Sequence, residues 1–160
     1  MRVKANKTKF DNETLHDIFS FVKPNNVKST KVDLYIGGTK WGIRKGRMYT
    51  KNSHGGNLIH LNVTNNSKLF PTKIRRSDKH LKRGYLRTGI LLNPEEALVE
   101  VMAHELRHVH QENKKHKTKV RGRRRERFSE KDADIYAIQM IRKWRKSQPI
   151  LVHDPSPLFK

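Results

Sequence analysis

Apolar side chains recur along the chain with two different periods, and each period predicts a different kind of element. Over residues 11–22 the apolar positions fall every three or four residues, which is typical of a helix with one buried face. Residues 32–36 and 58–63 instead alternate apolar with polar side chains, which predicts short strands. Residues 41–49, interrupted by two glycines, predict another strand between them. This part of the chain is therefore expected to form a meander of short antiparallel strands.

The second half of the chain predicts one more strand and two helices. Residues 85–92 have the composition of a strand, and Asn93 after them is a favourable N-cap with a proline at the first helical position. The helix that follows is expected to run over residues 94–111. Ser129 is a second N-cap, and acidic residues just after it suit the positive end of a helix dipole. A second helix is expected to follow it and to end near Lys146.

These elements predict an α+β fold with a single domain. A small antiparallel or mixed sheet is expected to pack on helix 94–111. The domain is expected to cover residues 11–146, because residues 1–10 have the composition of a flexible basic lead-in and residues 147–160 of an irregular, proline-containing tail. A chain of 160 residues is long enough to bury a core of its own.

Composition narrows the possible chemistry. The chain carries 36 Lys and Arg against 15 Asp and Glu, for a formal net charge of +21, and such an excess attracts polyanions. It contains no Cys, so any metal must be held by His and carboxylates. No apolar run approaches the roughly 20 residues of a membrane span, and no apolar stretch follows the basic start as in a secretory signal. We expect a protein of the cytosol or one associated with nucleic acid, such as a virion or mobile-element protein.

One motif in the first long helix carries recognisable chemistry. His104, Glu105 and His108 form the pattern HExxH. Two His four residues apart on a helix project to the same side, so both imidazoles can bind one zinc ion at about 2.0–2.1 Å. Glu105 is placed to reach a water on that metal rather than the metal itself. The sequence therefore predicts one zinc ion per chain, with Glu105 as a general base.

A catalytic zinc ion takes three protein ligands, so a third ligand must come from elsewhere in the chain. Glu130 is the preferred candidate, because it opens the next predicted helix. Asp134 lies one turn further along the same helix and can accept the N–H of a zinc-bound His, which would orient that ring. Four other residues are alternatives for the third ligand: Glu126, Asp132, His110 and His116. Of these, His110 is disfavoured because it projects to a different side of a regular helix.

The segments HELRH and SEKDAD together resemble the gluzincin metallopeptidases, whose pattern is HExxH followed by ExxxD. The resemblance covers about residues 85–145 and extends to small minimal gluzincins, including phage-associated anti-repressor peptidases. It implies a zincin-like fold, a protein or peptide substrate held by an edge strand, and hydrolysis by a zinc-activated water. It also implies a role for each matching residue: His104, His108 and Glu130 as zinc ligands and Glu105 as the general base.

The match to this family is incomplete in one respect, and a second family is a weaker match. Larger gluzincins have a downstream His or Tyr that stabilises the oxyanion, and the sequence contains no matching motif. The SprT-like proteases use three His ligands, and His116 would be the third ligand in that case. Its distance from His108 is short for that family.

A run of cations follows the first helix and supports a second hypothesis. Nine of the fifteen residues in 113–127 are Lys or Arg, which predicts a loop, and residues 71–87 form a second basic block. Such clusters neutralise phosphates, so the alternative function is a sequence-independent nucleic-acid-binding protein with a structural or inactive zinc site. An acidic protein partner would also suit them. The candidate phosphate-binding residues are Lys114, Lys115, Lys117, Lys119, Arg121, Arg123, Arg124, Arg125 and Arg127.

Overall fold

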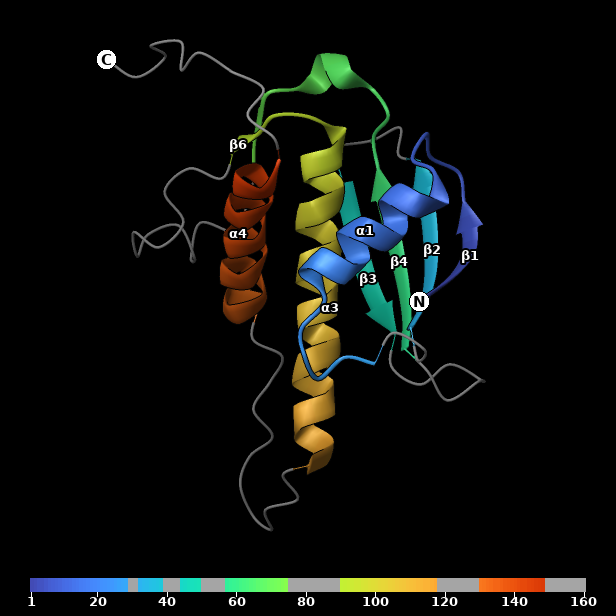
Figure 1. Ribbon diagram of the computed structural model, residues 1–160, viewed down its shortest axis with the longest axis vertical. Helices are drawn as coiled ribbons and strands as arrows, with labels where there is room; N and C mark the ends of the chain where they lie inside the picture. Colours follow the sequence, from blue (N-terminus) through green and yellow to red (C-terminus); the bar gives the residue numbers. More distant parts are fainter. Residues whose placement is uncertain (29–31, 39–43, 50–56, 75–89, 118–129, 149–160) are drawn as a thin grey trace, which may run out of the picture.

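The computed structural model has one layer of helices against one face of a mixed sheet (Figure 1). The α+β prediction is therefore confirmed. The structure describes residues 1–28, 32–38, 44–49, 57–74, 90–117 and 130–148.

Four strands form the main sheet, in the spatial order β1-β2-β4-β3. Strand β2 pairs in parallel with both β1 and β4, and only β3 runs antiparallel to its neighbour β4. The sheet is therefore mixed, and the antiparallel pairing of β3 with β4 is as expected. The expected antiparallel meander is wrong for β2, which pairs in parallel with β4 instead of forming a hairpin with β3. The strands are β1 (Arg2–Asn6), β2 (Val32–Gly38), β3 (Arg44–Tyr49) and β4 (Asn57–Val63).

The N-terminal residues belong to this sheet, although the sequence predicts a lead-in without regular structure. Arg2 donates two hydrogen bonds to the Asp33 carboxylate, at 2.9 and 3.0 Å. Beyond the strand, the backbone N–H of Lys7 donates to the carbonyl of Ile36 at 2.8 Å. Few apolar side chains mark this strand, because it lies at an edge of the sheet and a parallel partner supplies its backbone hydrogen bonds.

In the described part of the chain, helices pack over one face of the sheet and against one another. Helix α1 (Asn12–Val22) crosses in front of α3 (Pro94–Lys117) and the strands, and α4 (Glu130–Ser147) lies antiparallel beside α3 (Figure 1). A 3-10 turn, η2, spans Ser67–Leu69. Strands β5 (Thr72–Lys73) and β6 (Ile90–Leu91) form a separate antiparallel pair. Of the strand predicted at 85–92, only residues 90–92 lie within the described part.

The start of α3 is tied to its surroundings by side-chain hydrogen bonds. Asn93 accepts a hydrogen bond from the backbone N–H of Glu96 at 2.8 Å, as an N-cap does. Glu96 in turn accepts from the backbone N–H of Leu92 at 2.7 Å and binds Arg145 through both carboxylate oxygens. Arg145 also donates to the carbonyl of Ile90. These bonds join the C-terminal end of α4 to the N-terminal end of α3.

Helix α3 is longer than predicted. It continues to Lys117, so the first part of the basic run 113–127 is helix rather than loop. Lys has a good helix propensity, and a run of such residues can extend a helix that packing has already nucleated. The rest of the predicted loop lies outside the described residues, as does Ser129, the predicted N-cap of α4.

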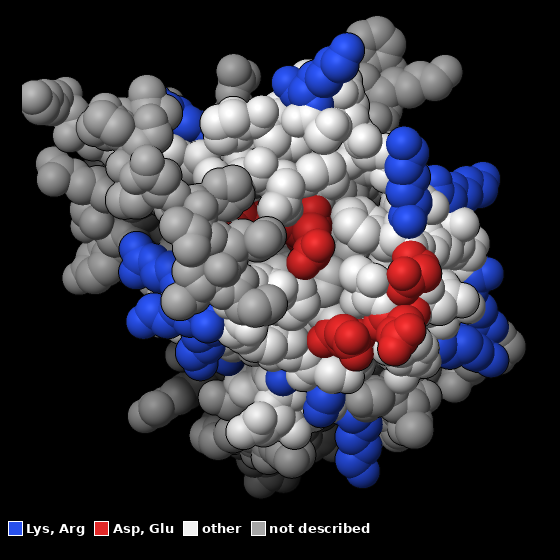
Figure 2. All heavy atoms as spheres, turned by 45° about the horizontal axis from the view of Figure 1, so that its top comes forward, with Lys and Arg blue, Asp and Glu red and all other residues white. Residues whose placement is uncertain are grey.

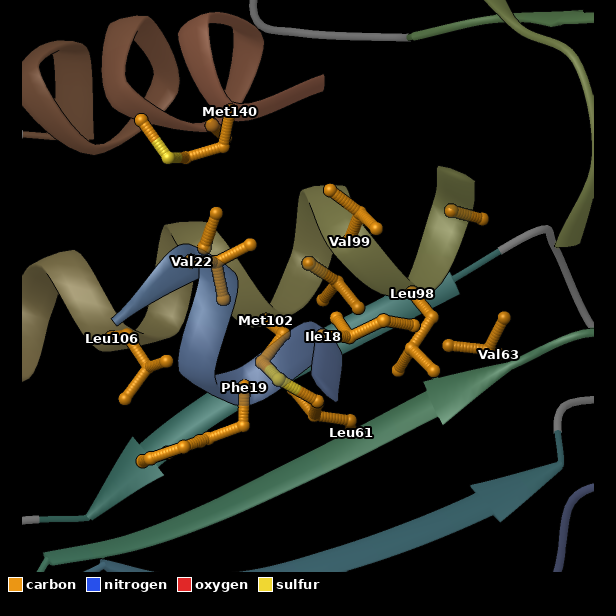
Figure 3. Packing of buried hydrophobic residues seen from close by; sticks show 14 of the residues in the cluster. Ile18, Phe19, Val22, Leu61, Val63, Leu98, Val99, Met102, Leu106 and Met140 are labelled. Carbon is orange, nitrogen blue, oxygen red and sulfur yellow. The ribbon is translucent and has the colours of Figure 1, made fainter. Parts of the chain in front are cut away.

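The core lies between the helices and the sheet. Side chains from α1, α3 and β4 meet in this layer, and Met140 of α4 lies on the side of α3 away from the strands (Figure 3). Alternation along β4 puts three residues almost completely into the core: Ile59, Leu61 and Val63. Helix α3 is buried around much of its circumference, which fixes the rotation of the HExxH motif relative to the sheet. Its buried apolar residues are Ala97, Leu98, Val99, Val101, Met102, Ala103, Leu106 and Val109.

Charge is unevenly distributed over the described surface. On the face shown in Figure 2, Asp and Glu side chains form small groups, and Lys and Arg side chains project around its margin. None of the helices in the described part of the chain is long and apolar enough to cross a membrane.

Candidate metal centre

Two helices bring three potential metal ligands together. His104 and His108 lie one turn apart in the middle of α3, and their Nε2 atoms are 3.2 Å apart. Glu130, the first residue of α4, places one carboxylate oxygen 3.3 Å from His104 Nε2 and the other 3.4 Å from His108 Nε2. The three side chains form a group that could hold a metal ion. The structure thus agrees with the sequence-based expectation that Glu130 joins the two His.

The local structure explains why Glu130 reaches the imidazoles. Helices α3 and α4 are antiparallel, so the first turn of α4 lies beside the middle of α3 (Figure 1). The α4 face that bears Ala133 and Ala137 is fully buried, and these small side chains allow a close approach to α3. The Glu130 side chain stays 60% exposed, whereas His104 is only 13% exposed. The ligand group is therefore open to solvent on the side of Glu130.

A second acidic residue of α4 contacts the other ring nitrogen of His104. Asp134 Oδ1 lies 3.1 Å from His104 Nδ1, and the Asp134 side chain is only 4% exposed. A buried carboxylate at this distance accepts the Nδ1–H proton, so the Nε2 lone pair of His104 points toward Glu130. The sequence-based expectation placed Asp134 in this position one turn after the ligand.

We predict that Asp134→Asn will weaken metal binding about 10- to 100-fold, the usual effect of removing the hydrogen-bonding partner of a ligand. The amide keeps the shape of the side chain but can present an N–H to His104, which disfavours the ligating tautomer. The measurement is the zinc dissociation constant by competition with a chelator. Asp17→Asn, an exposed substitution on α1, is the matched control. Equal affinities for both variants would contradict this role for Asp134.

His108 has a different partner, an uncharged side chain. Its Nδ1 lies 3.0 Å from Gln111 Oε1, three residues later on α3. The amide of Gln111 donates to Asp132 Oδ2 at 2.9 Å. Asp132 also accepts two hydrogen bonds from Arg107, at 2.7 and 2.9 Å. Asp132 was an alternative third ligand from its position in the sequence, but its carboxylate faces Arg107 and Gln111 instead.

The ion pair between Arg107 and Asp132 changes the pKa of both groups. Hydrogen bonds from the guanidinium hold the pKa of Asp132 below its usual value, and the same bonds raise the pKa of Arg107. Asp132 is therefore ionised wherever the imidazoles are neutral. The Arg107 guanidinium also lies 5.1 Å from the ring centroid of Tyr136, whose hydroxyl donates to the carbonyl of Val22. Burial raises the pKa of this Tyr136 hydroxyl.

Glu105 occupies the narrow space between α3 and the edge strand β3. It is 6% exposed and lies directly against Gly46 of β3. A Cβ atom at residue 46 would overlap the Glu105 carboxylate and would lie 2.7 Å from Cγ of Glu105 and 2.7 Å from Cγ2 of Val101. Only glycine allows the strand to approach the helix this closely. The sequence showed Gly46 only as an interruption in a strand pattern.

The remaining predicted site residues are placed as follows. His110 does not belong to the ligand group found among the described residues. Glu126 lies outside them, and His116 lies in the last turn of α3, where only the backbone is described. Lys114, Lys115 and Lys117 belong to α3, whereas Lys119 to Arg127 are not described, so phosphate binding by the basic run stays a prediction.

Two residues that contact the site were not predicted from the sequence, Gln111 and Arg107. The i, i+3 spacing of Gln111 from His108 could have indicated Gln111.

Comparison of the chain with protein-family models, curated proteins and solved structures finds no match.

Proposed function

We propose that the protein is a zinc-dependent metallopeptidase with a zincin-like arrangement of helices and edge strand. The observation that carries this proposal is the close spacing of the two Nε2 atoms and the Glu130 carboxylate. Tetrahedral zinc bonds of about 2.0–2.1 Å place neighbouring ligand atoms about 3.3–3.4 Å apart. The Nε2 atoms of His104 and His108 are 3.2 Å apart, His104 Nε2 lies 3.3 Å from one Glu130 oxygen, and His108 Nε2 lies 3.4 Å from the other Glu130 oxygen.

The donor set also suits a cation. Asp134 accepts a hydrogen bond from Nδ1–H of His104, and Gln111 accepts one from Nδ1–H of His108. Both Nε2 atoms therefore present lone pairs toward the Glu130 carboxylate. Two imidazole lone pairs and a carboxylate that face one another repel unless a positive charge lies between them. Two imidazoles and one carboxylate match the ligand set of catalytic zinc in several metallopeptidases. The described group has three members, which is the number that leaves a fourth position for water.

The residues around the ligands suit peptide hydrolysis. A bound zinc ion would acidify its water and polarise a substrate carbonyl. Glu105 would accept the proton of the attacking water and deliver it to the leaving amine. Its carboxylate is nearly buried against β3, which restricts the positions that it can adopt. Gly46 keeps this carboxylate between the helix and the strand.

Strand β3 supports a peptide as the substrate. It is the last strand in the order β1-β2-β4-β3, and among the described strands it pairs only with β4. Its outer edge can therefore add an extended peptide through backbone hydrogen bonds. Because β3 packs against the HExxH helix, a peptide on that edge would pass close to Glu105 and the ligands. This arrangement favours cleavage of a peptide bond over cleavage of a compact small molecule.

The proposal is tested on the purified full-length chain. Wild-type protein with one equivalent of zinc should cleave an unfolded protein such as casein, and removal of the metal by a chelator should abolish cleavage. Restoring zinc should restore it. Zinc binding without cleavage of unfolded proteins or of a peptide library would contradict the peptidase proposal and would favour a purely metal-binding role.

We predict that Gly46→Ala will lower hydrolysis strongly while zinc stays bound. The new methyl group must displace either the Glu105 carboxylate or strand β3, and neither group is a ligand. Overpacking of this kind costs about 1–3 kcal/mol of stability, so thermal unfolding should shift downward as well. Gly37→Ala is the matched control, because its Cβ would meet only the side chain of Asn62, away from the ligand group. If Gly46→Ala retained wild-type activity, Glu105 would not depend on this contact.

A further inference from the structure

We infer that Arg107, Asp132 and Gln111 form a relay that fixes His108 in its ligating tautomer, with Gln111 as the positioning residue. The inference rests on the metal centre of the proposed function. His104 is oriented directly by a carboxylate, Asp134, as in many metal sites. His108 is oriented by an amide, and an amide by itself does not specify which proton the imidazole carries.

The ambiguity of the amide is removed by its second contact. If Gln111 were turned the other way, its NH₂ group would face His108 Nδ1 and its oxygen would face the Asp132 carboxylate. Two acceptor oxygens would then lie about 2.9 Å apart. With the orientation found, the NH₂ group donates to Asp132 and the oxygen accepts Nδ1–H from His108. The charge on Asp132 therefore selects the Nδ1–H tautomer, which leaves Nε2 available for a metal.

The relay depends on Asp132 staying in place, and Arg107 provides this restraint. Its guanidinium holds both oxygens of Asp132 through two parallel hydrogen bonds, the strongest geometry for this pair. Arg107 lies in the motif itself, between Glu105 and His108, so its position follows from the same helix that carries the ligands. The Arg107–Asp132 pair also joins α3 to the first turn of α4, two residues after Glu130. One ion pair thus orients His108 and supports the position of Glu130.

The relay adds no net charge to the site. Arg107 balances Asp132, and Gln111 is neutral. Glu130 and Asp134 already supply carboxylates in contact with the imidazoles. A carboxylate in place of Gln111 would lie against Asp132 and would add a negative charge beside His108. The neutral amide therefore transmits the orientation of Asp132 without its charge.

The test measures the His108 tautomer and the zinc affinity separately. Long-range ¹H–¹⁵N NMR spectra of the metal-free, full-length protein at pH 8 distinguish Nδ1–H from Nε2–H, and the spectrum of His108→Asn assigns the signals. We expect Nδ1–H in the wild type. Gln111→Met removes both hydrogen bonds at nearly constant length, so it should shift His108 toward Nε2–H. It should also weaken zinc binding about 10- to 100-fold, as measured by competition with a chelator.

Two further variants keep the test decisive. Gln111→Asn is polar but one methylene too short to join His108 to Asp132, so it should reproduce both effects if Gln111→Met fails to fold. Gln139→Met, an exposed substitution on α4, should change neither. Wild-type tautomer and affinity in the Gln111 variants, Nε2–H on His108 in the wild type, or equal losses in Gln139→Met would overturn the relay. Failure of the wild type to bind zinc would instead contradict the proposed function, and the tautomer would still decide the relay.

Discussion

Glu105→Gln is expected to bind zinc as the wild type does and to lose hydrolysis almost completely. Glu105 is not one of the three side chains in the ligand group, so the zinc affinity should not change. The amide cannot accept the proton of the attacking water, and general-base catalysis typically contributes 10²–10⁴-fold. We therefore expect cleavage of an unfolded protein to fall by about this factor. The measurements are initial cleavage rates and the zinc content of the same preparation.

The control for this variant is Glu112→Gln, which removes a carboxylate from the same helix about two turns later. It should retain both zinc and activity. A Glu105→Gln protein with near-wild-type hydrolysis would exclude Glu105 as the base. Loss of zinc in this variant would show that Glu105 holds the metal, either directly or through the packing against Gly46.

Glu130→Gln is expected to reduce zinc affinity by more than the 10- to 100-fold effect of losing a partner of a ligand, because it removes a ligand itself. A neutral amide oxygen is a poor substitute for a carboxylate between two imidazoles. The Glu130 side chain is 60% exposed, so its replacement should leave the metal-free fold intact. The measurements are zinc competition titrations and thermal unfolding of the metal-free protein.

A matched control separates the ligand role of Glu130 from its effect on the helix. Glu13 also lies in the first turn of a helix, α1, and is exposed, so Glu13→Gln removes the same interaction with a helix dipole. Each substitution should cost at most about 1 kcal/mol of stability through the dipole. Only Glu130→Gln should lose zinc. Wild-type zinc affinity in Glu130→Gln would remove it from the ligand set and would direct attention to Glu126.

Local sequence patterns were sufficient to predict the helices that carry the site. The i, i+4 spacing of His104 and His108 depends only on helix geometry, and cap residues placed that helix correctly at its start. Glu130 and Asp134 were found because one turn of the next helix puts both carboxylates on one face. The C-terminal end of α3 was missed, since a dense run of cations has no clear stop signal and helix extension depends on the preceding packed turns.

The arrangement of the strands was not predictable in the same way. Alternation identifies a strand and its buried face but not its neighbour, so the parallel pairing of β2 with β4 was missed. The strand at Arg2–Asn6 was missed for a related reason, because an edge strand needs few apolar residues when its partner supplies the hydrogen bonds.

The chemistry available at the site follows from local sequence alone: two imidazoles on one side of a helix, one adjacent glutamate, and acidic residues at the start of the next helix. The orientation of these groups depends on contacts between elements that are distant in the sequence. Gly46 confines Glu105 because β3 crosses the helix at that residue. Gln111 orients His108 because Arg107 and Asp132, which are 25 residues apart, meet when α4 packs on α3. Spacing along a helix is a local property, whereas these contacts exist only after distant segments have packed together.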